Sequence, residues 1–303
     1  MKRNNPLVSS VHQRLLNVSK KRVVDFNLVL VWYAAERLLY RLSNSEYARD
    51  FVLKGAMLYT AWTGRSFRPT KDLDLLGYGD VSAQRLTAIF QRICRMELEP
   101  DGLDFDPDSI EVTEIRQDQE YQGQSVRVLV YLGNARIRLQ VDVGFGDVVT
   151  PEALEIEYPT LLDFPAPHIR VYPRETVVAE KFQAIVRLGM QNSRMKDFYD
   201  LWMIAKRFSF EGPVLVRAIE ATFDRRNTQV PASAPVALSN EFSASPDKHI
   251  QWKAFLKRSG IDERTAILGE IIDELRAFLM SAALAAVDGK PFDQTWTNGG
   301  PWS

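Results

Sequence analysis

The chain has 303 residues, of which 46% are hydrophobic and 25% are charged, and its formal net charge at pH 7 is −1. This composition is that of a globular protein of one large domain or two closely packed ones, and it excludes a protein whose whole surface binds polyanions. The single cysteine, Cys94, excludes an internal disulfide and a cysteine-built zinc site, and three scattered histidines argue against a histidine metal site. The longest apolar run, residues 28–35, is too short to cross a bilayer, and no apolar signal region follows the basic start, so a cytoplasmic protein is expected.

Apolar spacing in the first half of the chain predicts helices interspersed with strands. We expect helical structure over 8–42, a short strand over 51–53 and a helix from Met57 that ends at Gly64. An amphipathic helix is expected over 82–96. Three further stretches are expected to be strands, the last two joined by a hairpin turn at Gly133-Asn134: 110–115, 125–132 and 137–143. This order predicts an α+β core with a mixed sheet.

The second half is predicted to be mostly helical. Apolar faces at helical spacing predict helices over 175–188, 196–206, 212–223, 250–258 and 263–286. Residues 229–246 carry three prolines and are expected to form a surface loop. The Gly/Pro/Trp-rich tail from 288 to 303 is expected to dock on the protein through Trp296 and Trp302.

The most informative motifs are Thr70-Lys71-Asp72-Leu73-Asp74-Leu75 and Gln140-Val141-Asp142-Val143. Alternate side chains of a strand point to the same face, so Asp72 and Asp74 would lie side by side, and Asp142 could add a third carboxylate. Such a hard-oxygen site suits Mg²⁺, or Mn²⁺ in its place, and Mg²⁺ is the usual partner of nucleotide phosphates. The pattern therefore predicts nucleotidyl transfer with an NTP as substrate. The alternative is a polar strand end that faces water, because an isolated Asp-x-Asp is common by chance.

Residues around the first motif could bind phosphate. Lys54-Gly55-Ala56 marks a strand-to-helix turn whose backbone N–H groups could hold a phosphate. Arg65 and Arg68 lie just upstream of the aspartates, where their guanidinium groups could hold a triphosphate. Thr70, which opens the motif, is assigned to the same nucleotide-binding group.

A second constellation of charged residues lies in the helical half. On a helix, Asp197 and Asp200 are three residues apart and share a face. Lys181 lies one helix earlier and could reach the same cleft, where it would act as a point charge on nucleotide phosphates. The alternative is surface salt bridging, for example between Lys196 and Asp200. The spacing leaves both interpretations open.

Five segments of the chain, taken together, carry a family pattern: Phe51-Val52-Leu53-Lys54-Gly55-Ala56, Arg68-Pro69-Thr70-Lys71-Asp72-Leu73-Asp74-Leu75, Gln140-Val141-Asp142-Val143-Gly144-Phe145-Gly146-Asp147, Ala179-Glu180-Lys181-Phe182 and Asn192-Ser193-Arg194-Met195-Lys196-Asp197-Phe198-Tyr199-Asp200-Leu201. They resemble the AbiEii/AbiGii nucleotidyltransferase-like toxins, which include the MenT type. The resemblance covers most of residues 10–285. It implies a DNA polymerase β-like nucleotidyltransferase fold, with an α+β domain at 1–170 and a helical domain at 171–303 that completes the active-site cleft.

The resemblance also implies roles for single residues. Many nucleotidyltransferases carry Gly-Ser or Gly-Gly at the turn, whereas this chain has Gly55-Ala56, so only a backbone contact to phosphate is expected there. Asp142 fits the third-carboxylate position of the wider superfamily. The expected catalytic residues are Asp72, Asp74, Lys181 and Asp197. The expected metal ligands are Asp72, Asp74 and Asp142. The expected nucleotide-binding residues are Lys54, Gly55, Ala56, Arg65, Arg68, Thr70, Lys196 and Asp200.

The function that the resemblance implies is that of a toxin from a type IV toxin–antitoxin or phage abortive-infection system. Some relatives bind GTP, and others add nucleotides to the 3′ end of tRNA. We therefore expect Mg²⁺-dependent transfer of a nucleoside monophosphate from an NTP to the acceptor end of tRNA, which would block translation. Two alternatives stay open: a GTP-binding sensor without turnover, and nucleotidylation or phosphorylation of a protein target. The expected partner is a winged-helix antitoxin encoded nearby, which in such systems often forms no stable complex; no membrane partner is expected.

Overall fold

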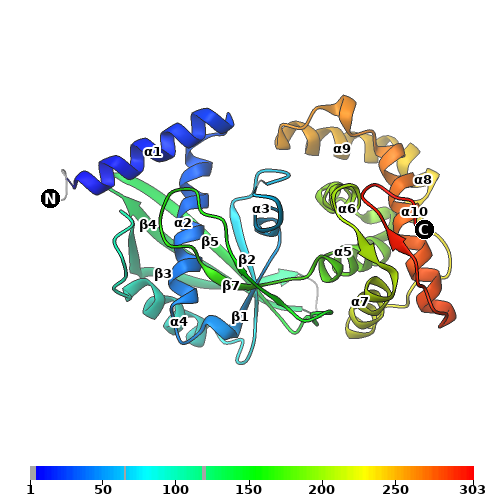
Figure 1. The fold of residues 1–303 in the computed structure, drawn as a ribbon, viewed down its shortest axis with the longest axis horizontal. Helices are drawn as coiled ribbons and strands as arrows, with labels where there is room; N and C mark the ends of the chain where they lie inside the picture. The colour runs from blue at the N-terminus through cyan, green and yellow to red at the C-terminus, as the bar shows by residue number, and fades with distance from the viewer. Residues whose placement is uncertain (1–4, 65, 118–120) are drawn as a thin grey trace. The chain divides into compact units, whose positions relative to one another are not determined.

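The structure is a computed structural model, which describes residues 5–64, 66–117 and 121–303 (Figure 1). The chain divides into two compact units. The first comprises the residues up to Gly146 together with Leu154–Val171, and the second comprises Asp147–Ala153 together with Tyr172–Ser303. The α+β domain expected at 1–170 and the helical domain expected at 171–303 stay a prediction.

The first unit contains a seven-stranded sheet with helices packed on it. Its helices are α1 Pro6–Arg22, α2 Phe26–Ser43, α3 Met57–Thr63 and α4 Ala83–Arg95, with a short 3-10 helix, η1, at Ala48–Asp50. Its strands are β1 Phe51–Lys54, β2 Asp72–Gly77, β3 Asp104–Gln117, β4 Tyr121–Leu132, β5 Ala135–Phe145, β6 Leu154–Glu157 and β7 His168–Val171.

The sheet is mixed, with the strand order β3-β4-β5-β2-β1-β7-β6. Strand β2 runs parallel to β5, and β1 runs parallel to β7. The remaining neighbours, from β3–β4 to β6–β7, are antiparallel. This confirms the expected α+β fold, and it places β2 between β5 and β1 in the middle of the sheet.

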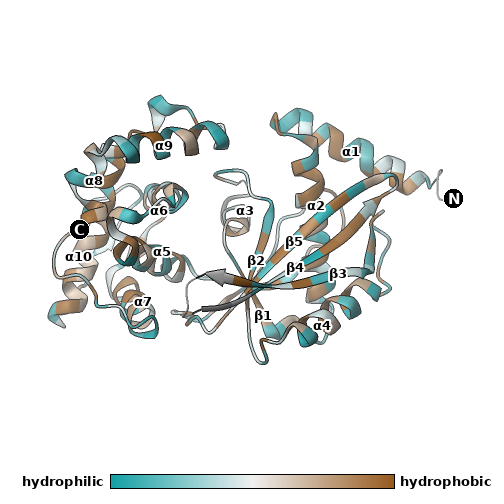
Figure 2. Cartoon of the chain, turned by 180° about the vertical axis from the view of Figure 1, so that it is seen from behind, coloured by the Kyte–Doolittle hydropathy of each residue, from teal (hydrophilic) through white to brown (hydrophobic). Residues whose placement is uncertain are grey.

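Along β5 one side of the sheet is buried and the other is polar, because Ile137, Leu139 and Val141 are buried while the residues between them are exposed or half-buried. Helix α2 packs on β5 and α4 packs on β3, and Figure 2 shows hydrophobic and hydrophilic bands alternating along β5. This is the period-2 pattern of a strand with one buried face. We refer to the other side as the polar face, which carries on β5 the residues Arg136, Arg138, Gln140 and Asp142.

The helical segment expected over 8–42 is two helices, because the chain turns at residues 23–25. Val23 ends α1 in the left-handed region with φ 53°, and its N–H donates to the Lys20 carbonyl at 3.3 Å. Asp25 then caps α2, since its Oδ1 accepts from the Leu28 N–H at 3.2 Å. A β-branched residue rarely takes this backbone conformation, and glycine or asparagine is the usual residue at such a helix end. Valine at this position therefore gave no signal in the sequence that the helix stops.

The second unit is helical, as expected for the C-terminal half. Its helices are α5 Arg174–Leu188, α6 Met195–Arg207, α7 Gly212–Arg225, α8 Asn240–Ala244, α9 Pro246–Ser259 and α10 Leu268–Asp288, with the 3-10 helices η2 Gly189–Gln191, η3 Val236–Leu238 and η4 Glu263–Thr265. A small sheet pairs β8 Phe210–Glu211 with β9 Thr295–Trp296. The long helix α10 packs against α6 and α7 and buries Ile272, Leu275 and Phe278 in this unit's core.

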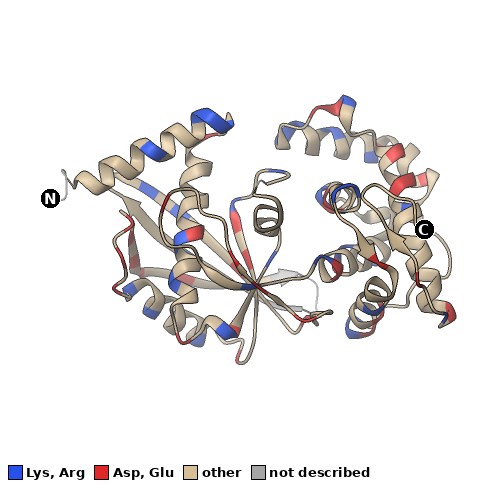
Figure 3. Cartoon of the chain, in the orientation of Figure 1, with Lys and Arg blue, Asp and Glu red and all other residues tan. Residues whose placement is uncertain are grey.

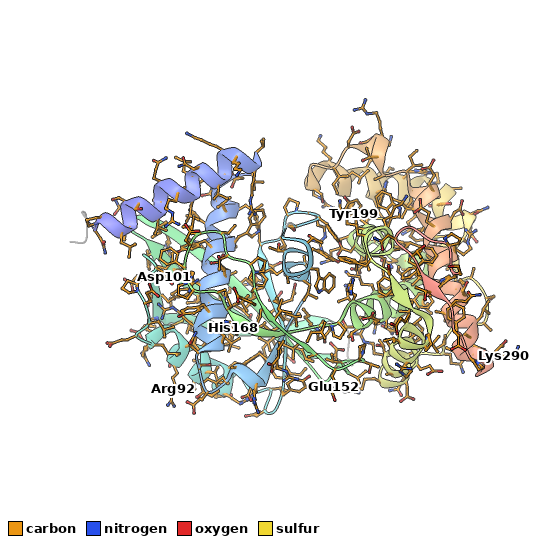
Figure 4. All side chains as sticks on the ribbon, in the orientation of Figure 1. Arg92, Asp101, Glu152, His168, Tyr199 and Lys290 are labelled. Carbon is orange, nitrogen blue, oxygen red and sulfur yellow. The ribbon has the colours of Figure 1, made fainter. Side chains whose placement is uncertain are left out.

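One expectation about a loop is wrong. Residues 229–246 are not one loop, because Leu238 and Phe242 are buried and the segment forms η3 and α8 there. His168 begins β7 (Figure 4). Strands β6 and β7 have only four residues each, too few for an alternating pattern to be recognised in the sequence.

The C-terminal tail docks on the second unit, as its tryptophans indicate. Trp296 is buried, and its Nε1 donates to the Ala205 carbonyl at 2.8 Å. Trp302 Nε1 donates to the Phe278 carbonyl at 3.0 Å. Of the helices in the described ranges, none combines the length and hydropathy that crossing a bilayer requires.

Candidate functional site

A row of polar residues crosses the polar face on four neighbouring strands. Asp74 on β2 is in register with Lys54 on β1 and with Asp142 on β5. Asp142 is in turn in register with Ser125 on β4. Registered partners on adjacent strands point to the same face of a sheet, so these four side chains share one side. The acidic residues on β2 are red in Figure 3.

The three aspartates expected to meet share this face. Asp72 is two residues before Asp74 on β2, and its register partner on β5 is Gln140, two residues before Asp142. Asp72 is exposed, and Asp74 and Asp142 are half-buried. The structure therefore brings together, on adjacent parallel strands, carboxylates that are some 70 positions apart in the chain.

Two residues that the sequence did not indicate hold the Asp142 carboxylate. Ser125 Oγ donates to Asp142 Oδ1 at 2.8 Å. Gln140 Nε2 donates to Oδ1 at 3.0 Å and to Oδ2 at 3.2 Å. These neutral donors fix the orientation of the carboxylate without adding a positive charge beside it. Gln140 could have been recognised from the period of the strand, but Ser125 depends on the pairing of β4 with β5.

The turn after β1 brings its backbone close to Asp74. Gly55 has φ 71°, which other residues rarely adopt, and a Cβ at this position would collide with the Asp74 carboxylate. Ala56 follows and is buried. Glycine is therefore required at position 55 both by the backbone conformation and by the space that Asp74 occupies.

Lys54 crosses the polar face from β1 towards β5. Its Nζ is 3.0 Å from the point that a Cβ on Gly144 would occupy. Gly144 lies two residues after Asp142 on the same strand, so its missing side chain makes room for the ammonium group. The sequence suggested Lys54 as a nucleotide-binding residue, whereas the role of Gly144 needed the register of three strands.

The carboxylate oxygens on the polar face are the kind of ligand that a hard divalent cation prefers. Within the described ranges, no group of three or more His, Cys, Asp or Glu side chains is gathered as metal ligands would be. Asp72, Asp74 and Asp142 nevertheless offer only carboxylate oxygens, which are the donors that Mg²⁺ and Mn²⁺ prefer, and all three are at least partly accessible.

Of the nucleotide-binding residues expected just upstream of β2, the structure describes Arg68 and Thr70. Arg65 lies outside the described residues. Arg68 is half-buried. The Thr70 carbonyl accepts a hydrogen bond from Trp32 Nε1 at 2.8 Å, which fixes the chain where it enters β2. Contacts of Arg68 and Thr70 with a nucleotide stay predictions.

The second constellation forms a buried ionic cluster between α5 and α6. Lys181 Nζ lies 2.7 Å from Asp197 Oδ1 and 3.1 Å from Asp200 Oδ2. Arg194 Nε lies 2.7 Å from Asp197 Oδ2. Both aspartate side chains are fully buried, so the alternative of surface salt bridging does not describe them. Lys196 is exposed instead.

The charge on Asp197 is strongly stabilised. Burial alone would raise the pKa of its carboxyl, but the Lys181 ammonium and the Arg194 guanidinium outweigh that effect and hold the pKa at about 2. Asp197 is therefore ionised at neutral pH, and it holds the ammonium of Lys181 in one place.

A further buried ionic contact in the second unit was not expected. Arg226 NH2 lies 2.8 Å from Asp147 Oδ1 and 3.4 Å from Glu180 Oε1. The Arg226 NH1 donates to Gln183 Oε1 at 3.1 Å. These contacts tie the short segment that contains Asp147 to α5 and α7. The carboxylates of the polar face belong to the first unit, and the Lys181 cluster belongs to the second.

A mixed α+β sheet that presents paired aspartates beside a strand-to-helix glycine turn is the arrangement that the sequence resemblance implies for the class of nucleotidyltransferases. The family follows from a family model described as "Nucleotidyl transferase AbiEii toxin, Type IV TA system", which matches residues 37–290. The chain belongs to this AbiEii toxin family, as the sequence resemblance predicts.

Comparison with solved structures gave distant likenesses. JHP933 from Helicobacter pylori is 16% identical with a TM-score of 0.46, and the match covers 84% of this chain and 89% of that chain. A second H. pylori structure, described as a candidate nucleotidyltransferase, has the same identity and TM-score and covers 84% of this chain and 92% of that chain. The comparison with curated proteins gave no match.

Proposed function

We propose that this toxin transfers a nucleoside monophosphate from an NTP to the 3′ end of tRNA in a Mg²⁺-dependent reaction, and that it thereby blocks translation. Membership of the AbiEii family supports a toxin of the nucleotidyltransferase class. The dependence on Mg²⁺, the tRNA acceptor and the block of translation are what we propose. The observation that supports it most is the register of Asp72, Asp74 and Asp142 on the polar face.

Asp72 and Asp74 would hold the metal, with Asp142 as a third oxygen donor. A bound Mg²⁺ or Mn²⁺ would neutralise charge on the triphosphate and lower the proton affinity of the attacking hydroxyl. Asp142 is oriented by Ser125 and Gln140, and its carboxylate would accept the proton of that hydroxyl. The close approach of the Gly55 backbone would keep Asp74 in position.

Cationic side chains would bind the phosphates. The Lys54 ammonium lies over the same face as the carboxylates, and it would offset the charge that builds on the departing pyrophosphate. Arg65, Arg68 and Thr70 would contact the triphosphate from the segment before β2. Lys181, whose ammonium group is fixed by Asp197 and Asp200, would act as a point charge on a nucleotide phosphate. Lys196, which is exposed, would add a further positive charge there.

The test replaces Asp74 by asparagine, which keeps the size of the side chain and removes its charge. Because phosphoryl transfer depends mainly on positioning and charge, Asp74→Asn should lower incorporation of labelled NTP into total tRNA by about 10²-fold or more. Asp163→Asn is the matched control, since the Asp163 side chain is exposed in the same unit and, among the described residues, forms an ion pair with Arg14 alone. Undiminished incorporation by Asp74→Asn would remove this residue from the mechanism.

Mass spectrometry of tRNA 3′ ends after expression identifies the acceptor. An added nucleotide supports the proposal. Unchanged 3′ ends together with labelled protein in a whole lysate would assign the same site to a protein target, and unchanged ends without any label would favour a sensor that binds GTP without turnover. The type IV toxin–antitoxin family implies an antitoxin partner, and we propose that a winged-helix protein encoded nearby is this partner.

A further inference from the structure

The polar face does not end at the carboxylates, because arginines continue it along β5 and β4. On β5 the alternate residues that precede Asp142 are Gln140, Arg138 and Arg136. On β4, Arg127 is the register partner of Gln140. Arg127, Arg136 and Arg138 therefore lie on the same side of the same sheet as Asp142, and blue bands mark these strands in Figure 3. We refer to these three residues as the arginine row.

The arginine row has no structural task that the described part of the chain reveals. All three residues are exposed, and no side chain in the described ranges forms an ion pair or hydrogen bond with them. Glu111 on β3 is the register partner of Arg127, yet the two do not form an ion pair. Cross-strand pairing is the ordinary reason for an arginine on an exposed strand, and it does not apply here.

The length of the row decides what it can bind. A strand advances about 3.3 Å per residue, so Arg138 lies about 13 Å and Arg136 about 20 Å along β5 from Asp142. A single triphosphate anchored at Asp72 and Asp74 is too short to reach Arg136. A polynucleotide presents one phosphate per nucleotide over any length, and guanidinium groups bind phosphate oxygens in pairs.

The neighbours of the row suit a polynucleotide. Tyr131 on β4 is half-buried and is the register partner of Arg136, so an aromatic and a basic residue share the polar face at the far end of the row. Aromatic rings and arginines are the usual supports for unpaired RNA bases. Acidic residues of β3 flank β4 on its outer side and would confine a polyanion to β4 and β5: Asp104, Asp106 and Glu111.

We propose that the arginine row binds the phosphate backbone of the RNA acceptor strand and leads its 3′ end to the carboxylates on β2 and β5. This inference rests on the proposed function, because it assigns the acceptor of that reaction to a particular surface. Arg127 would contact the phosphates nearest the reacting end, and Arg138 and Arg136 would contact those further from it.

The test measures tRNA binding directly, without NTP, by the fluorescence anisotropy of labelled tRNA over a series of salt concentrations. The variant Arg136→Gln/Arg138→Gln should bind about tenfold or more weakly, and its slope of log affinity against log salt should be smaller by about 1 for each phosphate that it no longer binds. The control is Arg92→Gln/Arg95→Gln, which removes the same charge from exposed arginines of α4 in the same unit. The single variant Arg127→Gln should also bind tRNA more weakly.

Three results would overturn the inference. The first is tRNA binding by the double variant that equals that of the control, with both folded by circular dichroism. The second is loss of NTP binding with intact tRNA binding, which would assign the row to the nucleotide. The third is displacement of tRNA by polyglutamate as readily as by unlabelled tRNA, which would assign it to an acidic protein. Failure of the proposed function looks different: wild-type protein would bind tRNA through the row without extending its 3′ end.

Discussion

Gly55 and Gly64 have the same backbone conformation in different surroundings. Their φ angles are 71° and 70°. A Cβ on Gly55 would collide with the Asp74 carboxylate, whereas a Cβ on Gly64 would meet no described atom within 4 Å. Substituting each glycine by alanine can therefore distinguish the energetic cost of a left-handed backbone from the cost of displacing the Asp74 side chain.

We expect Gly55→Ala and Gly64→Ala to lower the free energy of unfolding by a similar backbone term, about 1–2 kcal/mol. Gly55→Ala should in addition lower NTP incorporation by about tenfold or more, because Asp74 must move to admit the methyl group. Urea unfolding and the labelled-NTP assay measure the two effects. Equal activity in the two variants would show that Asp74 tolerates the displacement.

At the residue scale the sequence indicated the carboxylates but not what holds them. The alternation of Asp72 and Asp74 is local, and an apolar strand around Asp142 is local as well, so both could be recognised. The hydrogen bond from Ser125 and the space at Gly144 come from strand pairing across the sheet. Burial of Asp197 between two helices is likewise a tertiary effect, which spacing left undecided.

At the scale of elements, long periodic segments were predicted well and short ones were not. Helices α4, α5 and α6 fall within one or two residues of the expected bounds, because an apolar stripe over 13 or more residues is unambiguous. The break between α1 and α2 was missed because Val23 ends a helix without a usual stop signal. Strands β6 and β7 exist because they pair with each other and with β1, which no local pattern reveals.

The docked tail predicts a large effect from one residue. Trp296 is 4% exposed, packs on Phe278 with ring centroids 4.9 Å apart, and pairs through its strand with Phe210. Trp296→Ala should lower the free energy of unfolding by about 3–5 kcal/mol, because the alanine buries less apolar surface and leaves a cavity. Urea denaturation followed by circular dichroism measures this decrease.

Leu284→Ala provides the comparison for this prediction, because Leu284 lies on α10 in the same unit and is 42% exposed. It should cost no more than about 0.5 kcal/mol. A decrease for Trp296→Ala as small as that of Leu284→Ala would mean that the tail contributes little to the stability of the second unit.

At the scale of the whole molecule, two buried carboxyls set opposite dependences of stability on pH. In the first unit, burial raises the pKa of Glu36 to about 7, although the Leu161 N–H and Arg37 favour its ionised form. In the second unit, the pKa of Asp197 is lowered to about 2. Asp197 therefore stabilises the fold above its ordinary pKa of 3.8, and this contribution disappears as the pH falls towards 2.

The contribution of Glu36 to stability depends on pH in the opposite direction. Its folded pKa lies above its ordinary value of 4.5, so the folded state binds more protons than the unfolded state between about pH 4.5 and 7. Stability should therefore fall as the pH rises through this range. Glu36→Gln, which cannot ionise, should flatten this part of the curve. Thermal unfolding of both proteins from pH 4.5 to 8 tests this, and parallel curves would contradict it.

The chain passes between its two units three times, at residues 146–147, 153–154 and 171–172. A stretch of seven residues, Asp147–Ala153, thus belongs to the unit that is otherwise encoded downstream, and it brings Asp147 to Arg226. A recombination event that exchanged only the gene region after residue 171 would join an arginine from one parent to an aspartate from the other. The path of the chain therefore favours inheritance of the first and second units as a single block.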